Sequence, residues 1–225
     1  MMTTKFYTLE NNSNWTRGFP WVSRIINGLK DVMYCDLCKV TIDCPVGTVQ
    51  VTLQSDKGIR WPDILGCGGG WPLTIVSQRV LSQWREDGIG EFPVDKLEIL
   101  NPVPKKLPRD QMPEYFWLDG EQMLGAKVDF DASGYVDVRF CPKCGRRTHD
   151  ISATYDRQHS GVWPIAFVPE SWNGANVFTT DLSPAAFFCT EKVVECARKH
   201  RHTNFKFVPA ERAGSSLQGI DYLKR

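Results

Sequence analysis

Two Cys-x-x-Cys pairs constrain the fold of this chain more than any other feature. Cys35 and Cys38 form the first pair; Cys141 and Cys144 form the second, which Gly145 follows. Two thiols at this spacing converge on one ion because the turn between them directs both sulfur atoms into one concavity. A glycine after the second thiol allows the chain a positive φ there. The pattern predicts a structural Zn²⁺ ion, and the alternative is ordinary buried or redox thiols.

The spacing between the pairs leaves two metal arrangements open. Four thiolates around one ion form the usual closed structural zinc site, but 102 residues separate Cys38 from Cys141. Because the cost of loop closure rises only with the logarithm of loop length, we favour one shared four-cysteine site. The alternative is one site per half, with Cys44 or Cys67 completing the first and His149 completing the second.

The second feature is an apparent internal repeat. Residues 75–85 match residues 188–198 in residue class at almost every position, and Ser77 and Thr190 are good N-caps for a helix in each segment. The offset between the two helices is similar to the offset between the two Cys pairs. We therefore predict an α+β fold with an internal pseudo-repeat: two related halves, each with a zinc knuckle, antiparallel sheet and one capped helix. The alternative is chance similarity between two amphipathic helices.

Proline content suggests the domain boundaries. Four prolines fall within residues 101–114, a density that a sheet interior does not tolerate, so this segment is predicted to be a linker. The expected divisions are a first unit at 1–100, a second unit at 115–212 and a flexible tail at 213–225, although both units could pack as one globular body. Period-two alternation and β-prone residues predict strands at 4–9, 48–53, 135–140 and 205–208, and the repeated segments predict helices at 78–87 and 191–200.

Composition and missing motifs narrow the classes of function. The chain has 225 residues, 42% of them hydrophobic, which is enough for a sizeable core. Without a signal-peptide pattern or an apolar run of membrane-spanning length, we expect a cytoplasmic protein with no membrane partner, whose eight cysteines serve metal and core. In that core we place Cys189 and Cys196. The net charge of +1 argues against a nucleic-acid partner. No His-Glu-x-x-His, Gly-x-Ser-x-Gly or phosphate-loop pattern occurs, so an enzyme is not expected.

Three groups of residues together resemble a known family. They are Lys5 to Glu10, the two Cys-x-x-Cys turns, and the run from Asp181 through Thr190 to Phe207. The pattern resembles the double-CXXCG-motif family of bacterial proteins, which includes immunity proteins paired with swarming-inhibition and other polymorphic, contact-delivered toxins. The second Cys motif matches fully, whereas Lys39 stands where the family usually has glycine. The resemblance implies a small non-catalytic protein that binds and neutralises a cognate toxin domain, with zinc as a structural element.

An interface with such a toxin would use large aromatic and cationic side chains, which commonly anchor protein interfaces. The candidates are Trp61, Trp71, Trp163, Trp172, Arg146 and Arg147. The competing interpretation is a zinc-ribbon nucleic-acid-binding or regulatory protein, because Arg139, Lys143, Arg146 and Arg147 cluster around the second turn. A third interpretation is a redox protein that uses Cys141 and Cys144.

Overall fold

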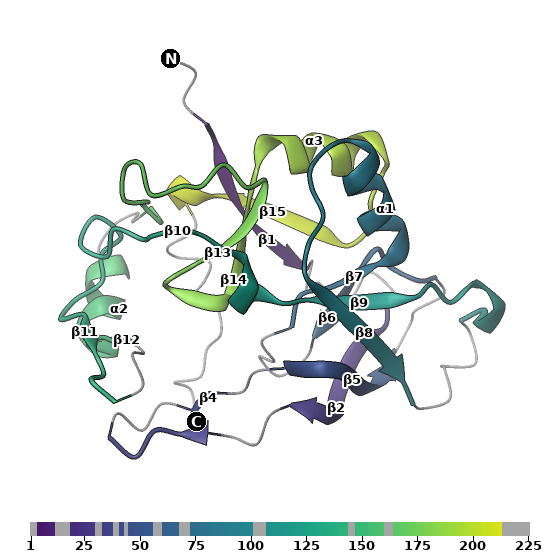
Figure 1. Cartoon of the computed structure of the whole chain (residues 1–225), viewed down its shortest axis with the longest axis horizontal. Coiled ribbons are helices and arrows are strands. Elements are labelled where there is room, and N and C mark those ends of the chain that lie inside the picture. The colour runs from purple at the N-terminus through teal and green to yellow at the C-terminus, as the bar shows by residue number, and fades with distance from the viewer. Residues whose placement is uncertain are drawn as a thin grey trace.

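The protein has a mixed α+β fold with few helices and several sheets (Figure 1). The structure is a computed structural model, and it describes residues 4–11, 19–29, 33–37, 41–42, 45–55, 60–67, 73–100, 107–143, 147–159 and 164–212. The α+β class is therefore confirmed. None of the helices in these ranges has the length and apolar composition needed to cross a membrane.

Six strands close into a barrel. In spatial order they are β2 (Trp21–Leu29), β5 (Pro45–Gln54), β8 (Val94–Ile99), β9 (Tyr115–Leu118), β7 (Ile75–Ser77) and β6 (Ile64–Cys67). The predicted strand at 48–53 is confirmed as part of β5, where Val49, Val51 and Leu53 alternate inward and are buried. These side chains form the barrel core with Trp117 and other apolar residues. Burial of one face of β5 is what the period-two pattern of residues 48–53 indicated.

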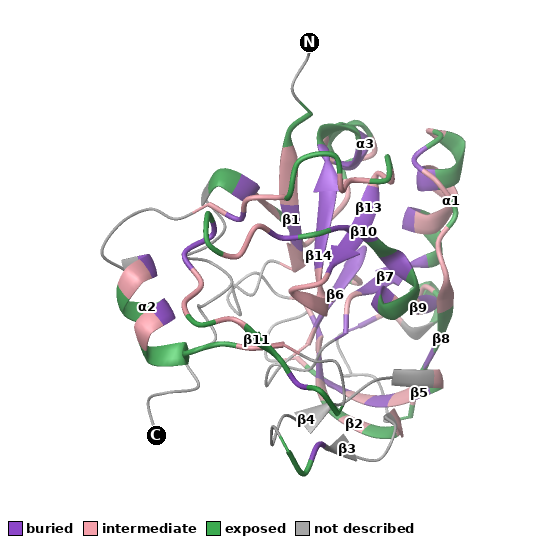
Figure 2. Ribbon diagram, turned by 60° about the vertical axis from the view of Figure 1, so that its left-hand side comes forward, coloured by how far each residue is buried: buried purple, intermediate pink, exposed green. Residues whose placement is uncertain are grey.

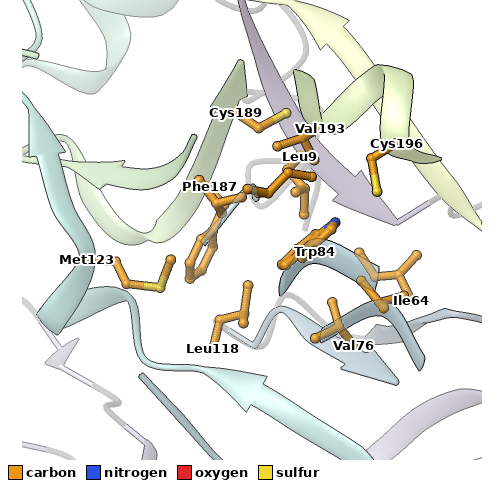
Figure 3. Packing of buried hydrophobic residues seen from close by; sticks show 13 residues of the cluster. Leu9, Ile64, Val76, Trp84, Leu118, Met123, Phe187, Cys189, Val193 and Cys196 are labelled. Atoms are coloured by element: carbon orange, nitrogen blue, oxygen red, sulfur yellow. The ribbon is translucent and has the colours of Figure 1, made fainter. Parts of the chain in front are cut away.

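A second sheet has five strands. Their order is β10 (Leu124–Ala126), β13 (Val177–Thr180), β14 (Ser183–Thr190), β1 (Phe6–Asn11) and β15 (Phe205–Pro209). One face of this sheet contributes Phe187 and Cys189 to a core shared with Trp84 (Figure 3). The other face carries Phe178 and Phe188, which stack at 6.0 Å between ring centroids. The predicted strands at 4–9 and 205–208 are confirmed as β1 and β15.

The two predicted capped helices are confirmed as α1 (Gln78–Glu86) and α3 (Glu191–Lys199). Ser77 caps α1 by accepting a hydrogen bond from the Val80 amide. Thr190 is the N-cap residue of α3, but its hydroxyl donates to Asn176 Oδ1 instead of capping the helix. The helices lie beside each other (Figure 1), and they share the apolar core that surrounds Trp84.

The same strand pairing occurs twice, at one constant offset along the chain. Ile64 pairs with Val76 in β6 and β7, and Val177 pairs with Cys189 in β13 and β14. Val177 follows Ile64 in the sequence by the same number of residues as Cys189 follows Val76. The hydrogen bond from the Ser77 amide to the Asp63 carbonyl also recurs, from the Thr190 amide to the Asn176 carbonyl. Each strand pair then leads directly into α1 or α3.

The flanking strands are exchanged between the two halves of the chain. In the barrel, β9 lies between β7 and β8; in the five-stranded sheet, β1 takes the corresponding place between β14 and β15. Thus the N-terminal strand completes the sheet of the second half, and the strand after the proline-rich segment completes the barrel of the first. The division at residues 101–114 stays a prediction, but strand pairing crosses it in both directions.

The prediction of antiparallel sheets with one helix per half was wrong in two respects. The pairs β2–β6, β5–β8 and β10–β13 are parallel. For β5 and β8 the reason is the crossover through β6, β7 and α1, which returns the chain in the same direction. In addition, the second half contains α2 (Ile151–His159), a helix that the apolar pattern did not indicate. The described elements also include three short 3-10 helices: η2 (Arg109–Gln111), η3 (Gly120–Met123) and η4 (Ala210–Arg212).

The predicted strand at 135–140 is only partly present. Only its last two residues form a strand, β11 (Arg139–Phe140). The reason lies in the preceding residues: the amide of Val136 donates to Thr154 Oγ1 of α2, and Asp137 has a φ of 53°, which interrupts extended backbone.

Asp63 joins the two halves of the chain through a buried carboxylate. Its Oδ1 accepts from Arg79 at 2.9 Å and its Oδ2 accepts from the Thr203 amide at 2.8 Å. The hydroxyls of Ser77 and Thr203 donate to it as well. A charge this deeply buried is stable only because several donors surround it.

We expect Asp63→Ala to lower the free energy of unfolding by about 3 kcal/mol, because it leaves the Thr203 amide without its acceptor and Arg79 without its carboxylate partner. Urea unfolding of the purified variant measures this. Asp95→Ala, at an exposed position in β8, is the control and should change the value by less than about 0.5 kcal/mol. Equal stability of the two variants would contradict a linking role for Asp63.

Candidate metal centre

The two Cys-x-x-Cys turns lie in two small hairpins of the same design. The first joins β3 (Met33–Tyr34) to β4 (Thr41–Ile42), and the second joins β11 to β12 (Arg147–Thr148). In both, six residues connect the paired strands, and the cysteines are the first and fourth of those six. β4 and β11, one strand of each hairpin, lie away from α1 and α3 (Figure 1), and β11 is exposed (Figure 2).

The hairpins bring one cysteine from each half of the chain together. Cys35 Sγ lies 3.7 Å from Cys141 Sγ, and both residues are buried. A disulfide would require about 2.05 Å. Two thiolates on one tetrahedral zinc ion, with Zn–S bonds of about 2.3 Å, lie about 3.8 Å apart. The observed separation therefore fits two ligands of a shared ion. The other two predicted ligands, Cys38 and Cys144, lie outside the described residues.

An ion pair also joins the two turns. Lys143 Nζ, between the cysteines of the second turn, lies 2.6 Å from Asp36 Oδ1, between the cysteines of the first. Both side chains are exposed, so the pair adds little stability on its own. It does show a second contact between the two turns, beside the one between Cys35 and Cys141.

Arg147 anchors the second hairpin to the body of the protein. Its guanidinium lies over the rings of Phe130, at 4.3 Å, and Phe140, at 4.7 Å, and it donates to Asp181 Oδ2 at 2.5 Å. Asp181 in turn accepts from the amide of Val128 through Oδ1. The side chain of Arg147 is only 17% exposed, so its charge is used within the protein.

Two of the predicted interface tryptophans make internal contacts. The indole of Trp61 packs near Tyr115 and donates to the carbonyl of Pro108 at 2.8 Å. Trp172 meets Phe6 edge to face and donates to the carbonyl of Ala175. Trp71, Trp163 and Arg146 lie outside the described residues. Their role at an interface stays a prediction.

Two apolar side chains next to the cysteine turns are exposed instead. Leu37, inside the first turn, is 59% exposed, and Phe140, directly before Cys141, is 63% exposed. Neither residue was among the interface residues predicted from the sequence. The available signal was an apolar residue within or beside a Cys-x-x-Cys turn.

Cys67, His149 and Cys44 were the additional ligands considered for one metal site in each half of the chain. Cys67 ends β6, and burial raises the pKa of its thiol to about 12. His149 lies edge-on to Tyr135 at 5.1 Å, and burial lowers the pKa of its imidazole. Cys44 lies outside the described residues.

A second group of side chains could hold a metal ion. Asp87, Cys196 and His200 place one carboxylate oxygen, one sulfur and one ring nitrogen within 4.8 Å of one another. Asp87 is the C-cap of α1, whereas Cys196 and His200 lie in α3 and at its C-cap. The sequence analysis assigned Cys196 to the core, where it is indeed buried, and did not select this cluster. The overlooked signal was the spacing of four between Cys196 and His200.

Hydrogen bonds already organise this cluster without an ion. Lys199 Nζ lies 2.6 Å from Asp87 Oδ1, and His200 Nε2 lies 3.0 Å from Asp87 Oδ2. The pKa of the Asp87 carboxyl is lowered to about 2, and the hydrogen bond from Lys199 is the main cause. Burial, together with Asp87, raises the pKa of the Cys196 thiol to about 12. The carboxylate is therefore ionised and the thiol is protonated.

Comparison with known proteins adds no family. No protein family model matches the chain, and no curated protein matches it in sequence.

Proposed function

We propose that this protein is an immunity protein that binds and neutralises a cognate bacterial toxin domain in the cytoplasm, with one structural zinc ion held by Cys35, Cys38, Cys141 and Cys144. The observation that carries the metal part is the 3.7 Å approach of Cys35 Sγ and Cys141 Sγ. It supports one shared site over one site per half. Zn²⁺ bound by four thiolates has no open position for water, so its contribution is rigidity and not catalysis.

The scaffold supports the same proposal. The strand pairing that recurs at one constant offset, and the exchange of β1 and β9, favour two related halves that interlock. A zinc ion shared by both halves would fix the hairpins on this interlocked body. Tight inhibition of a partner benefits from such a preorganised surface, because little conformational entropy is lost on binding.

The surface around the metal turns provides the partner site in this proposal. Leu37 and Phe140 present apolar area beside the two buried cysteines, and the ion pair between Asp36 and Lys143 adds polar groups next to it. An apolar centre with polar neighbours is the usual arrangement of a protein interface. This placement moves the expected interface from Trp61, Trp172 and Arg147 to the turns themselves.

Charge pairing argues against nucleic acid as the partner. Of the four basic residues near the second turn, Arg139, Lys143 and Arg147 each form an ion pair with an aspartate. Phosphate binding would have to break these pairs. A mobility-shift assay with random DNA and RNA at increasing salt should show no binding that weakens with salt, since such weakening is the signature of phosphate contacts.

Co-expression tests the immunity function. A toxin-like C-terminal domain encoded by the gene immediately upstream should arrest growth alone, and co-expression of this chain should restore growth and give a complex on size-exclusion chromatography. A toxic domain that remains toxic in the presence of soluble, zinc-containing protein would refute the proposal.

Point variants test the surface. Leu37→Asp and Phe140→Asp should each weaken binding of the toxin domain by at least about tenfold, because a charge is placed in an apolar contact. Leu124→Asp is the matched control, since Leu124 is 55% exposed but lies on the edge strand β10. Calorimetric titration measures affinity and zinc analysis verifies metal content. Equal affinity in all three variants would place the interface elsewhere.

A further inference from the structure

We propose a second metal site, separate from the cysteine turns, in which Asp87, Cys196 and His200 bind a divalent transition-metal ion, Zn²⁺ in particular, between α1 and α3. The three ligand atoms already lie within 4.8 Å of one another. That spread suits a single ion, because ligand atoms at about 2.0 to 2.3 Å from zinc lie less than about 4 Å apart. Binding would therefore draw the ligand atoms closer together than they lie in the structure.

The local structure explains how the chain presents these ligands. Cys196 and His200 are four residues apart, so their side chains share one face of α3. That face packs on α1, and Cys196 belongs to the same buried cluster as Trp84 of α1 (Figure 3). Asp87 ends α1 and so reaches the same point from the other helix.

Reciprocal contacts hold the two helices in this arrangement. Arg79 of α1 donates to the carbonyl of His200 at 2.6 Å, and Lys192 of α3 donates to the carbonyl of Gly88 at 2.6 Å. Arg79 and Lys192 occupy equivalent positions in the two repeated segments. The ligands therefore lie on elements whose relative position is fixed by contacts on both sides of the cluster, as a preorganised metal site requires.

The ligand set selects the kind of ion. One thiolate, one imidazole and one carboxylate suit Zn²⁺ or Co²⁺, whereas Mg²⁺ and Ca²⁺ prefer oxygen ligands alone. Loss of the thiol proton gives two negative ligands, whose charges balance a divalent cation. Three protein ligands leave the fourth tetrahedral position for water or for a donor from another molecule. This distinguishes the site from a closed four-cysteine centre.

Lys199 is the competitor for this ion. Its ammonium group holds Asp87 Oδ1 at 2.6 Å, but its side chain is 64% exposed and can move into solvent when a metal binds. The proposal therefore includes an exchange in which the ion replaces Lys199 as the cation next to Asp87. An ion held against such competition binds more weakly than one in a four-cysteine site.

Metal analysis of the full-length chain tests the site. After equilibration with excess zinc and removal of loosely bound metal, wild type should retain about two zinc ions per chain. Cys196→Ala and His200→Gln should each retain about one. Cys189→Ala and His202→Gln are matched controls: one removes another buried thiol and the other a neighbouring imidazole, and both should retain two.

Cobalt titration adds a readout that structural damage does not imitate. The second equivalent of Co²⁺ should give a weaker sulfur-to-metal absorption band than the four-thiolate centre, and Cys196→Ala should lose it. Lys199→Gln should bind the second equivalent about tenfold more tightly, because the competing cation is gone. Gain of affinity in a surface variant cannot result from misfolding.

The outcomes separate this inference from the proposed four-cysteine zinc. Cys141→Ser should lose the four-thiolate absorption and keep the weaker band. If neither wild type nor Lys199→Gln binds, in excess cobalt, an ion that is lost in Cys196→Ala, the inference is overturned, whether or not the cysteine turns hold an ion of their own. The same holds if the second ion persists in both Cys196→Ala and His200→Gln.

Discussion

Replacing Cys141 with serine is expected to release the zinc ion at the cysteine turns and to lower the melting temperature by about 8 to 16 °C. Cys141 Sγ is buried and lies 3.7 Å from Cys35 Sγ, so the proposed ion has ligands from both halves of the chain. A ligand that binds only the folded state, present at about 1,000 times its Kd, stabilises that state by about 4 kcal/mol. For a domain of this size, each 1 kcal/mol corresponds to about 2 to 4 °C.

Three measurements check this expectation together. Zinc content should fall by about one ion per chain, thermal unfolding should shift downward, and a chelator should produce the same shift in wild type but little further change in Cys141→Ser. Cys67→Ser is the control, because Cys67 is a cysteine of the barrel outside the two turns. Unchanged zinc content and melting temperature in Cys141→Ser would show that Cys141 is not a ligand of a zinc ion.

Local sequence signals located the elements whose shape is set by nearby residues. The capped helices α1 and α3 were predicted to within a residue because a Ser or Thr precedes a stretch with apolar residues on one face. In contrast, α2 has a polar inner face: buried Thr154 accepts from the Val136 amide, and buried Gln158 donates to the Ser133 carbonyl. A search for apolar periodicity cannot find such a helix.

Long-range pairings could not be predicted in this way. Nothing local in the Phe6–Asn11 strand shows that it pairs with β14 and β15, near the other end of the chain, because any strand edge of suitable register offers the same hydrogen bonds. The candidate metal ligands differ in the same way, between those that a local motif indicates and those that only the fold brings together. Cys35 and Cys141 were matched by their motif, whereas Asp87 and His200 meet only because two helices end at one place.

The exchange of β1 and β9 leads to the second large expected effect. If the chain is cut within residues 101–106, each half expressed alone should be insoluble or unfolded. The N-terminal fragment would retain β6, β7 and β8 but lose β9, which lies between β7 and β8. The C-terminal fragment would lose β1, which lies between β14 and β15 and carries the buried Leu9. Each fragment would therefore expose unpaired strand edges in the middle of a sheet, a strong cause of aggregation.

Co-expression of the two fragments should restore a soluble one-to-one complex. Both missing strands are then supplied in trans, and the ligands of the cysteine turns come from opposite fragments. Circular dichroism and size-exclusion chromatography of the separate and combined fragments measure this. Two variants of the N-terminal fragment form a matched pair. Leu9→Asp places a charge in the core shared with Trp84 and should prevent recovery of the complex. Glu10→Gln changes a half-buried polar position of the same strand and should allow recovery.

Independent folding of either fragment would show that the strand exchange is not needed for stability. It would favour the simpler division into two autonomous units at the proline-rich segment. Recovery only on co-expression would instead show that the two halves form one cooperative body. In that case the proposed zinc ion would not hold two finished domains together, but would reinforce an arrangement that the exchanged strands already require.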